Sequence, residues 1–129
     1  MAAKKKILAV DDDAGICELY ETGIPAMGYD LTCASSGKQA KAQIAKEIPD
    51  LILMDIMMPD LDGITLTREI LSDPKTSKVP ILIVSGLSDA ATLNDALLFG
   101  AVDYVVKPLD MNVLKSKIER CLAIAEKRK

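Results

Sequence analysis

Short apolar runs alternate along the chain with longer segments in which apolar residues recur every three or four positions. Short runs bounded by turn residues are typical of buried strands, and the longer spacing is typical of amphipathic helices. We predict five strands, over residues 6–10, 30–34, 51–55, 81–85 and 104–106. Because strands and helices alternate, the expected fold is α/β, a doubly wound parallel sheet with five helices on its two faces.

The helical stripes differ in clarity. The stripe of the second helix consists of Ala40, Ile44 and Ile48, and the stripe of the fifth helix is the clearest. The first helix is expected to kink or end at Pro25, since proline cannot donate a helix hydrogen bond. No repeat or linker interrupts the pattern, so we expect residues 1–129 to form one domain.

Composition narrows the classes of function. The net charge is −3, which argues against direct nucleic-acid binding, since that needs clustered Lys and Arg. The chain contains no histidine, which excludes catalytic triads and His-ligated zinc. Its three widely spaced cysteines suit small buried apolar residues in a reducing compartment. No segment reaches membrane-spanning length or suits a signal peptide, so we expect a cytoplasmic protein with no membrane partner.

Charged and polar residues stand where four of the five predicted strands end. These residues are Asp11 and Asp12, Asp55, Ser85 and Lys107. In open α/β sheets, ligands bind outside the carboxyl ends of the strands, so these side chains should converge on one edge. A buried strand has no structural need for a charged residue at its end, and the pattern therefore indicates a site.

The residue types in this group indicate a particular chemistry. Crowded carboxylates repel one another unless a hard cation lies among them, and oxygen ligands favour Mg²⁺ or Ca²⁺. A lysine and a serine hydroxyl can contact further oxygens of a phosphate bound at such an ion. Asp55 could then act as a nucleophile and form an aspartyl phosphate. We therefore predict Mg²⁺-dependent phosphoryl transfer to Asp55.

Four segments together resemble the receiver domain of two-component response regulators, the CheY-like family. They are ILAVDDD, LILMDIMMPDLDG, ILIVSG and DYVVKPL, and they span nearly the whole chain in order. The resemblance implies a flavodoxin-like fold with strand order 2-1-3-4-5. It also implies a signalling phosphoacceptor, not an enzyme, with a histidine kinase or histidine phosphotransfer protein as phosphoryl donor.

The resemblance also implies roles for single residues. Asp55 matches the phosphoacceptor, and Asp11 and Asp12 match the acidic pair that binds Mg²⁺, with Asp12 the better candidate for direct ligation. Met57 matches the residue whose backbone carbonyl completes the metal site.

Further matches concern the phosphoryl contacts and the conformational switch. Ser85 and Lys107 match the hydroxyl and ammonium groups that contact the phosphoryl group. The peptide bond from Lys107 to Pro108 is expected to be cis. Tyr104 matches the aromatic switch position, which implies a downstream protein at the face made by the fourth helix, fifth strand and fifth helix.

Three other aspartates have simpler interpretations. Asp13 is expected to cap the first helix. Asp60 and Asp62 are interpreted as turn residues, with Asp62 and Gly63 matching an Asp-Gly pair of the family.

Two other classes of function are open from the residues alone. A Mg²⁺-dependent aspartyl-phosphate phosphatase or mutase also uses an aspartate at the end of a strand, but it needs a general acid two residues later, where Met57 stands. A nucleotide-binding flavodoxin-like module would need a glycine-rich phosphate loop, and the chain has neither GxGxxG nor GxxxxGK. The chain stops near the end of its fifth predicted helix, so we expect either a stand-alone regulator or the excised receiver of a longer protein.

Overall fold

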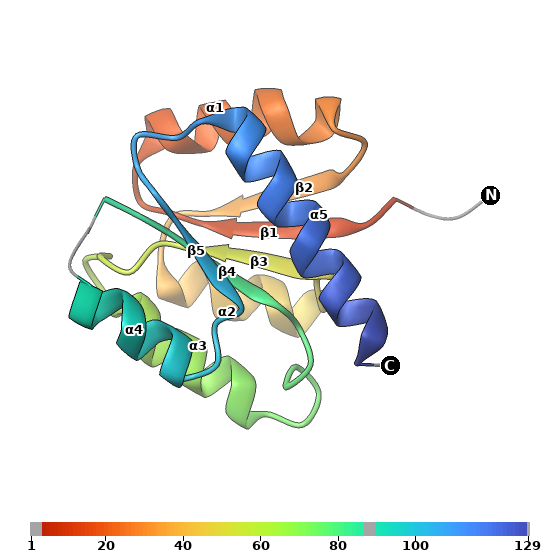
Figure 1. Cartoon of the computed structure of the whole chain (residues 1–129). Helices are drawn as coiled ribbons and strands as arrows, with labels where there is room; N and C mark the ends of the chain where they lie inside the picture. The colour runs from red at the N-terminus through yellow and green to blue at the C-terminus, as the bar shows by residue number, and fades with distance from the viewer. Residues whose placement is uncertain (1–3, 87–89, 129) are drawn as a thin grey trace.

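The computed structural model describes residues 4–86 and 90–128, with side chains left undescribed at 90–92. Strands and helices alternate strictly along the chain (Figure 1). The strands are β1 (Lys6–Val10), β2 (Asp30–Ala34), β3 (Leu51–Met54), β4 (Ile81–Ser85) and β5 (Asp103–Val106). The helices are α1 (Ala14–Ala26), α2 (Gly37–Lys46), α3 (Gly63–Ser72), α4 (Ala90–Leu98) and α5 (Met111–Lys127).

All strand pairs are parallel, and the sheet order is β2-β1-β3-β4-β5. This confirms the predicted α/β fold and the order 2-1-3-4-5. The order reverses after β1, because β2 lies on one side of it and β3 on the other. Ligand sites of such sheets form beside the carboxyl ends of the strands at this reversal, which here are the ends of β1 and β3.

Alternate residues of the central strands enter two separate cores, one on each face of the sheet. In β3, Leu51 and Leu53 pack with α1 and α5, whereas Ile52 and Met54 pack with α2, α3 and α4. All four side chains are buried, which explains why the strand is a continuous apolar run with no polar alternation. Figure 1 shows the same division of the helices between the two faces.

Several predicted boundaries need small corrections. Strand β3 ends at Met54, one residue before the predicted end. Helix α2 ends at Lys46, so Ile48 lies outside it and is exposed. Pro49 accounts for this, because the residue before a proline is driven out of the helical conformation. Helix α1 ends at Ala26, directly after Pro25, in agreement with the proline prediction.

The cysteines only partly match their predicted role as buried apolar residues. Cys121 is buried in α5, but Cys17 and Cys33 are half-buried, so the prediction was wrong for these two. Burial raises the pKa of Cys33 to about 12. Among the residues that the structure describes, no helix is long and apolar enough to cross a membrane.

Two buried threonines differ in whether their hydroxyl groups have a hydrogen-bond partner. The hydroxyl of Thr76 donates to the carbonyl of Ile70. The hydroxyl of Thr67, in α3, is fully buried and has no partner among the described residues. A buried polar group without a partner loses its hydration and gains nothing in return.

We predict that Thr67→Val raises the free energy of unfolding by about 1 kcal/mol, because it removes an unsatisfied hydroxyl at nearly constant volume. Thr76→Val is the matched control, since it deletes a satisfied hydroxyl and should lower the same quantity by about 1 kcal/mol. Urea unfolding of the three proteins measures both changes. Destabilisation of the Thr67→Val protein would contradict the prediction.

Candidate phosphoryl-acceptor site

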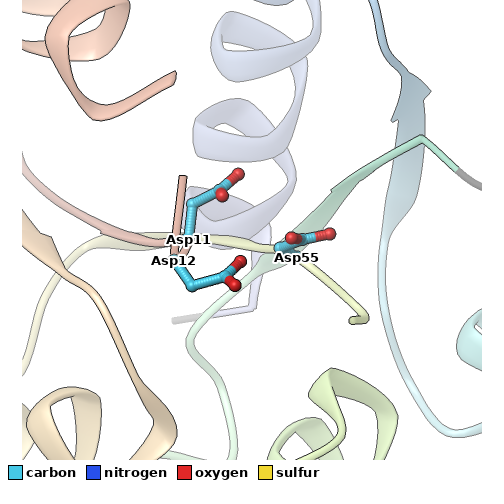
Figure 2. A group of neighbouring side chains, drawn as sticks. All are labelled: Asp11, Asp12 and Asp55. Atoms are coloured by element: carbon cyan, nitrogen blue, oxygen red, sulfur yellow. The ribbon is translucent and has the colours of Figure 1, made fainter. Parts of the chain in front are cut away.

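Three carboxylates converge where β1 and β3 end. Asp11 and Asp12 follow β1, and Asp55 follows β3, whose register pairs Val10 with Met54. The backbone amide of Asp55 donates to the carbonyl of Val10 at 2.9 Å, which holds the two chain ends together. Each of the three aspartates offers a carboxylate oxygen within 4.8 Å of the others (Figure 2).

The three aspartates differ in exposure. Asp11 is 1% exposed and Asp55 is 7% exposed, whereas Asp12 is exposed to solvent. The side chain of Asp11 accepts from the backbone amide of Asp13 at 2.9 Å. Asp13 caps α1, accepting from the amide of Gly15 at 2.8 Å, as predicted. Two buried carboxylates and one solvated carboxylate therefore form an open acidic cluster.

Lys107 is the cation of the cluster, reaching it from the end of β5. Its Nζ lies 2.8 Å from Asp11 Oδ2 and 3.6 Å from Asp55 Oδ2. Its backbone amide donates to the carbonyl of Ser85 at 2.8 Å, and the following peptide bond to Pro108 is cis, as predicted. Burial alone would lower the pKa of Lys107, but the hydrogen bond and charge of Asp11 and the charge of Asp55 raise it overall. The ammonium group is thus held in its charged form.

The charge of Lys107 does not fully offset the effects of burial and of the neighbouring Asp11 carboxylate on Asp55. Burial raises the pKa of Asp55, and the negative charge of Asp11 raises it further. Lys107 and the backbone amides of Ile56 and Met57 act in the opposite direction without cancelling these effects. The cluster therefore favours a further positive charge near Asp55.

The loop between β3 and α3 closes tightly over Asp55. The amide of Gly63 donates to the carbonyl of Ile56 at 2.8 Å. A Cβ at Gly63 would lie 2.0 Å from the carbonyl oxygen of Asp55, so only glycine permits this approach. Met57 lies in the loop with an exposed side chain. Together with Asp12, residues Ile56–Pro59 line one open cavity.

The remaining two predicted site residues lie on β4 and β5. Ser85 is buried at the carboxyl end of β4, where its carbonyl binds the Lys107 amide. Tyr104 lies on β5, paired in register with Ile83, and is 36% exposed. The structure thus brings Asp11, Asp12, Asp55 and Lys107 into one group, with Ser85 beside it. Tyr104 lies one strand away on β5, outside this group. The functional roles of all these residues remain predictions.

The interpretation of Asp60 as a turn residue missed its main contact. Its carboxylate accepts from the amides of Gly37 and Lys38 at 3.0 and 3.1 Å, at the start of α2. The hydrogen bonds from these amides hold the pKa of Asp60 below its ordinary value, the amide of Gly37 having the largest effect. The partner lies 22 or 23 positions away, so nothing in the local sequence signals it. Asp62 caps α3, accepting from the amide of Ile64 at 2.8 Å.

The chain is similar in sequence to parts of longer regulatory proteins. A relative named "Probable transcriptional regulator ycf27", from Guillardia theta, is 40% identical over 95% of this chain and 47% of its own length. The transcriptional regulatory protein ZraR of Escherichia coli K12 is 38% identical over 91% of this chain and 26% of its own length. The chain therefore spans about half, or less, of these relatives.

Solved structures agree in fold over nearly the whole chain. The receiver domain of Francisella response regulator 1452 has a TM-score of 0.85 at 30% identity and covers 98% of this chain and 100% of its own. A CheY-like receiver domain protein from Methanospirillum hungatei has a TM-score of 0.90 at 28% identity, with coverage of 98% and 100%. The profile described as the response regulator receiver domain matches residues 7–119. The chain belongs to the response regulator receiver domain family.

Proposed function

We propose that Asp55 of this receiver domain accepts a phosphoryl group from a histidine kinase or a histidine phosphotransfer protein, in a reaction that depends on Mg²⁺. The observation that carries the proposal is the cluster of Asp11, Asp12 and Asp55 within 4.8 Å, with Lys107 bound at its edge. A buried carboxylate beside a cation and an open acidic cluster suits a nucleophile that receives an anionic group.

The residues that would hold Mg²⁺ are Asp11, Asp12 and Asp55, together with the backbone carbonyl of Met57. All supply oxygen atoms, as this small, hard cation prefers, and the exposure of Asp12 suits direct ligation. When bound, Mg²⁺ supplies positive charge that offsets the carboxylates and the phosphoryl oxygens.

The protein groups have distinct tasks in the transfer. A carboxylate oxygen of Asp55 forms a bond to phosphorus while the phosphorus–nitrogen bond of the donor's phosphohistidine breaks, and the electron pair returns to the imidazole. Lys107, already 3.6 Å from Asp55, contacts the incoming phosphoryl oxygens. Ser85, next to Lys107 through the backbone, donates its hydroxyl to another oxygen.

We further propose that the output is a protein-binding surface. Residues 1–129 act as a single receiver domain in the cytoplasm, and the net charge of −3 suits a protein partner better than direct contact with nucleic acid. Phosphorylation draws Ser85 toward the new group, and Tyr104 turns from its 36% exposed position to a more buried one. The face of α4, β5 and α5 changes as a result and binds the downstream partner.

The first prediction from this proposal concerns the metal. Asp12→Asn should weaken Mg²⁺ binding by at least about tenfold. Even the loss of a residue that only supports a metal ligand weakens metal binding by about this factor. Asp11→Asn should weaken it less. Without the ion, Asp12→Asn should keep or raise the melting temperature, because it relieves repulsion between carboxylates.

A Mg²⁺ titration followed by amide chemical shifts measures this. Asp13→Asn is the matched control, because it removes the same charge one position away and asparagine caps a helix as well as aspartate. Equal affinity in the Asp11, Asp12 and Asp13 variants would contradict the assignment.

The second prediction concerns the acceptor. With an acyl phosphate and Mg²⁺, the wild-type protein should gain one hydroxylamine-sensitive phosphoryl group, and Asp55→Asn should gain none. Lys107→Ala should still be labelled in part, since the nucleophile is intact, but should lose the conformational response. Mass spectrometry of the intact protein and its peptides locates the label.

Labelling mainly at another residue would overturn the acceptor assignment. Multiple turnover of a phosphomonoester would instead favour a phosphatase or mutase.

The third prediction concerns the switch. An acyl-phosphate mimic with Mg²⁺ should change amide shifts from Asp55 through Ser85 and Tyr104 to residues near Leu93 and Leu114. In Ser85→Ala the changes should stop near the phosphate, because the hydroxyl that couples the site to β4 is gone. Wild-type changes confined to the phosphate contacts would show that Tyr104 is not part of a switch.

A further inference from the structure

The first turn of α2 is capped from two different parts of the chain. Ser36, directly before the helix, accepts from the amide of Gln39 at 3.1 Å. The two preceding amides, those of Gly37 and Lys38, donate instead to Oδ1 and Oδ2 of Asp60 at 3.0 and 3.1 Å. Asp60 belongs to the loop that runs from β3 to α3. A distant loop therefore supplies most of the cap of α2, and both carboxylate oxygens are used.

A second contact holds the same loop on the same turn. A Cβ built at Gly37 would lie 2.9 Å from Cβ of Leu61, so Leu61 packs where a larger residue would stand. Gly37 is buried, and Leu61 packs against the core on that face of the sheet. Asp60 and Leu61, two consecutive loop residues, thus bind one helix turn by charge and by packing. We call this pair of contacts the α2 clamp.

The β3–α3 loop is also held by contacts of Gly63, at the start of α3. Gly63 donates its amide to the carbonyl of Ile56 and packs against the Asp55 carbonyl. Met57 lies between this closure and the α2 clamp, and it shares a cavity with Asp12. The conformation of the Met57 backbone therefore depends on both fixed points, one of which is Asp60.

We infer that Asp60 is a positioning residue for the metal site, because the α2 clamp holds the loop whose Met57 carbonyl is to meet the ion. This inference rests on the proposed function, which assigns that carbonyl to Mg²⁺. The amides of Ile56 and Met57, which donate to the Asp55 carboxylate, are held by the same loop. If the loop is released from α2, both the Met57 carbonyl and the amides that bind the Asp55 carboxylate therefore become less well ordered.

The inference also predicts coupling in the opposite direction. If the α2 clamp favours Mg²⁺ binding, bound Mg²⁺ must strengthen the clamp by the same factor. The amides of Gly37 and Lys38 should accordingly exchange with solvent more slowly when Mg²⁺ is present. A cap that served only the stability of α2 would show no such response.

The test compares three variants with the wild-type protein. Asp60→Ala removes the clamp, Asp60→Asn removes the same charge but keeps an amide oxygen that caps helices well, and Ser36→Ala removes only the local cap of the same helix. A Mg²⁺ titration followed by amide shifts at fixed ionic strength gives the dissociation constants. Thermal unfolding without Mg²⁺ gives the melting temperatures.

Asp60→Ala should weaken Mg²⁺ binding about tenfold, because the loss of a residue that orients a metal ligand weakens metal affinity by about this factor. Asp60→Asn should restore most of the affinity. Ser36→Ala should bind Mg²⁺ as the wild type does, although its melting temperature falls as that of Asp60→Ala does.

Three outcomes would overturn the inference. The first is wild-type Mg²⁺ affinity in Asp60→Ala. The second is an equal loss of Mg²⁺ affinity in Asp60→Ala and Asp60→Asn, which would assign the effect to charge, and the third is an equal loss in Ser36→Ala, which would assign it to the stability of α2. If the wild-type protein itself fails to bind Mg²⁺, the proposed function fails instead. The clamp is then judged without the ion: Asp60→Ala must speed exchange of the Gly63 amide more than Ser36→Ala does, and equal rates overturn the inference.

Discussion

The structure depends on how electrostatic repulsion is managed at the ends of β1 and β3. Asp11 and Asp55 are both buried, and water therefore screens their charges little. Lys107 Nζ lies 2.8 Å from Asp11 Oδ2 and 3.6 Å from Asp55 Oδ2, so it offsets the charge of Asp11 better than the charge of Asp55. The repulsion between the two carboxylates that remains is the reason that a further positive charge would be favourable at this position.

The rest of the fold serves to hold these charges together against that repulsion. The parallel register of β1 and β3 sets their separation, and the chain beyond β5 brings Lys107 to them. The two apolar cores provide the free energy that a charged group of this kind costs. Charges that the fold already holds in place are preorganised, so no rearrangement is needed before a further charged group can bind.

The sequence predicts those features that have a local physical cause. Apolar runs reveal the strands, Asp13 caps the helix that follows it, and four polar strand ends indicate the site. The order 2-1-3-4-5 follows from the family resemblance, because periodicity does not distinguish neighbours in a sheet. The contact of Asp60 with α2 depends on where two distant segments meet in space, and no local pattern encodes it. The same holds for the preference of Lys107 for Asp11 over Asp55.

Helix α4 carries apolar side chains on its buried side and on its exposed side. Among its described side chains only Leu93 and Ala96 are buried, while Leu98 is 81% exposed directly before the turn at Phe99. Phe99 is covered by the guanidinium of Arg68, 4.6 Å from its ring centre. Because the free energy of local opening depends on the buried contacts of an element, Leu93 and Ala96 help to set how readily this part of α4 opens. A change of packing at Leu93 or Ala96 would therefore alter the surface on this side of the sheet while the core beneath α1 and α5, on the other face, keeps its contacts.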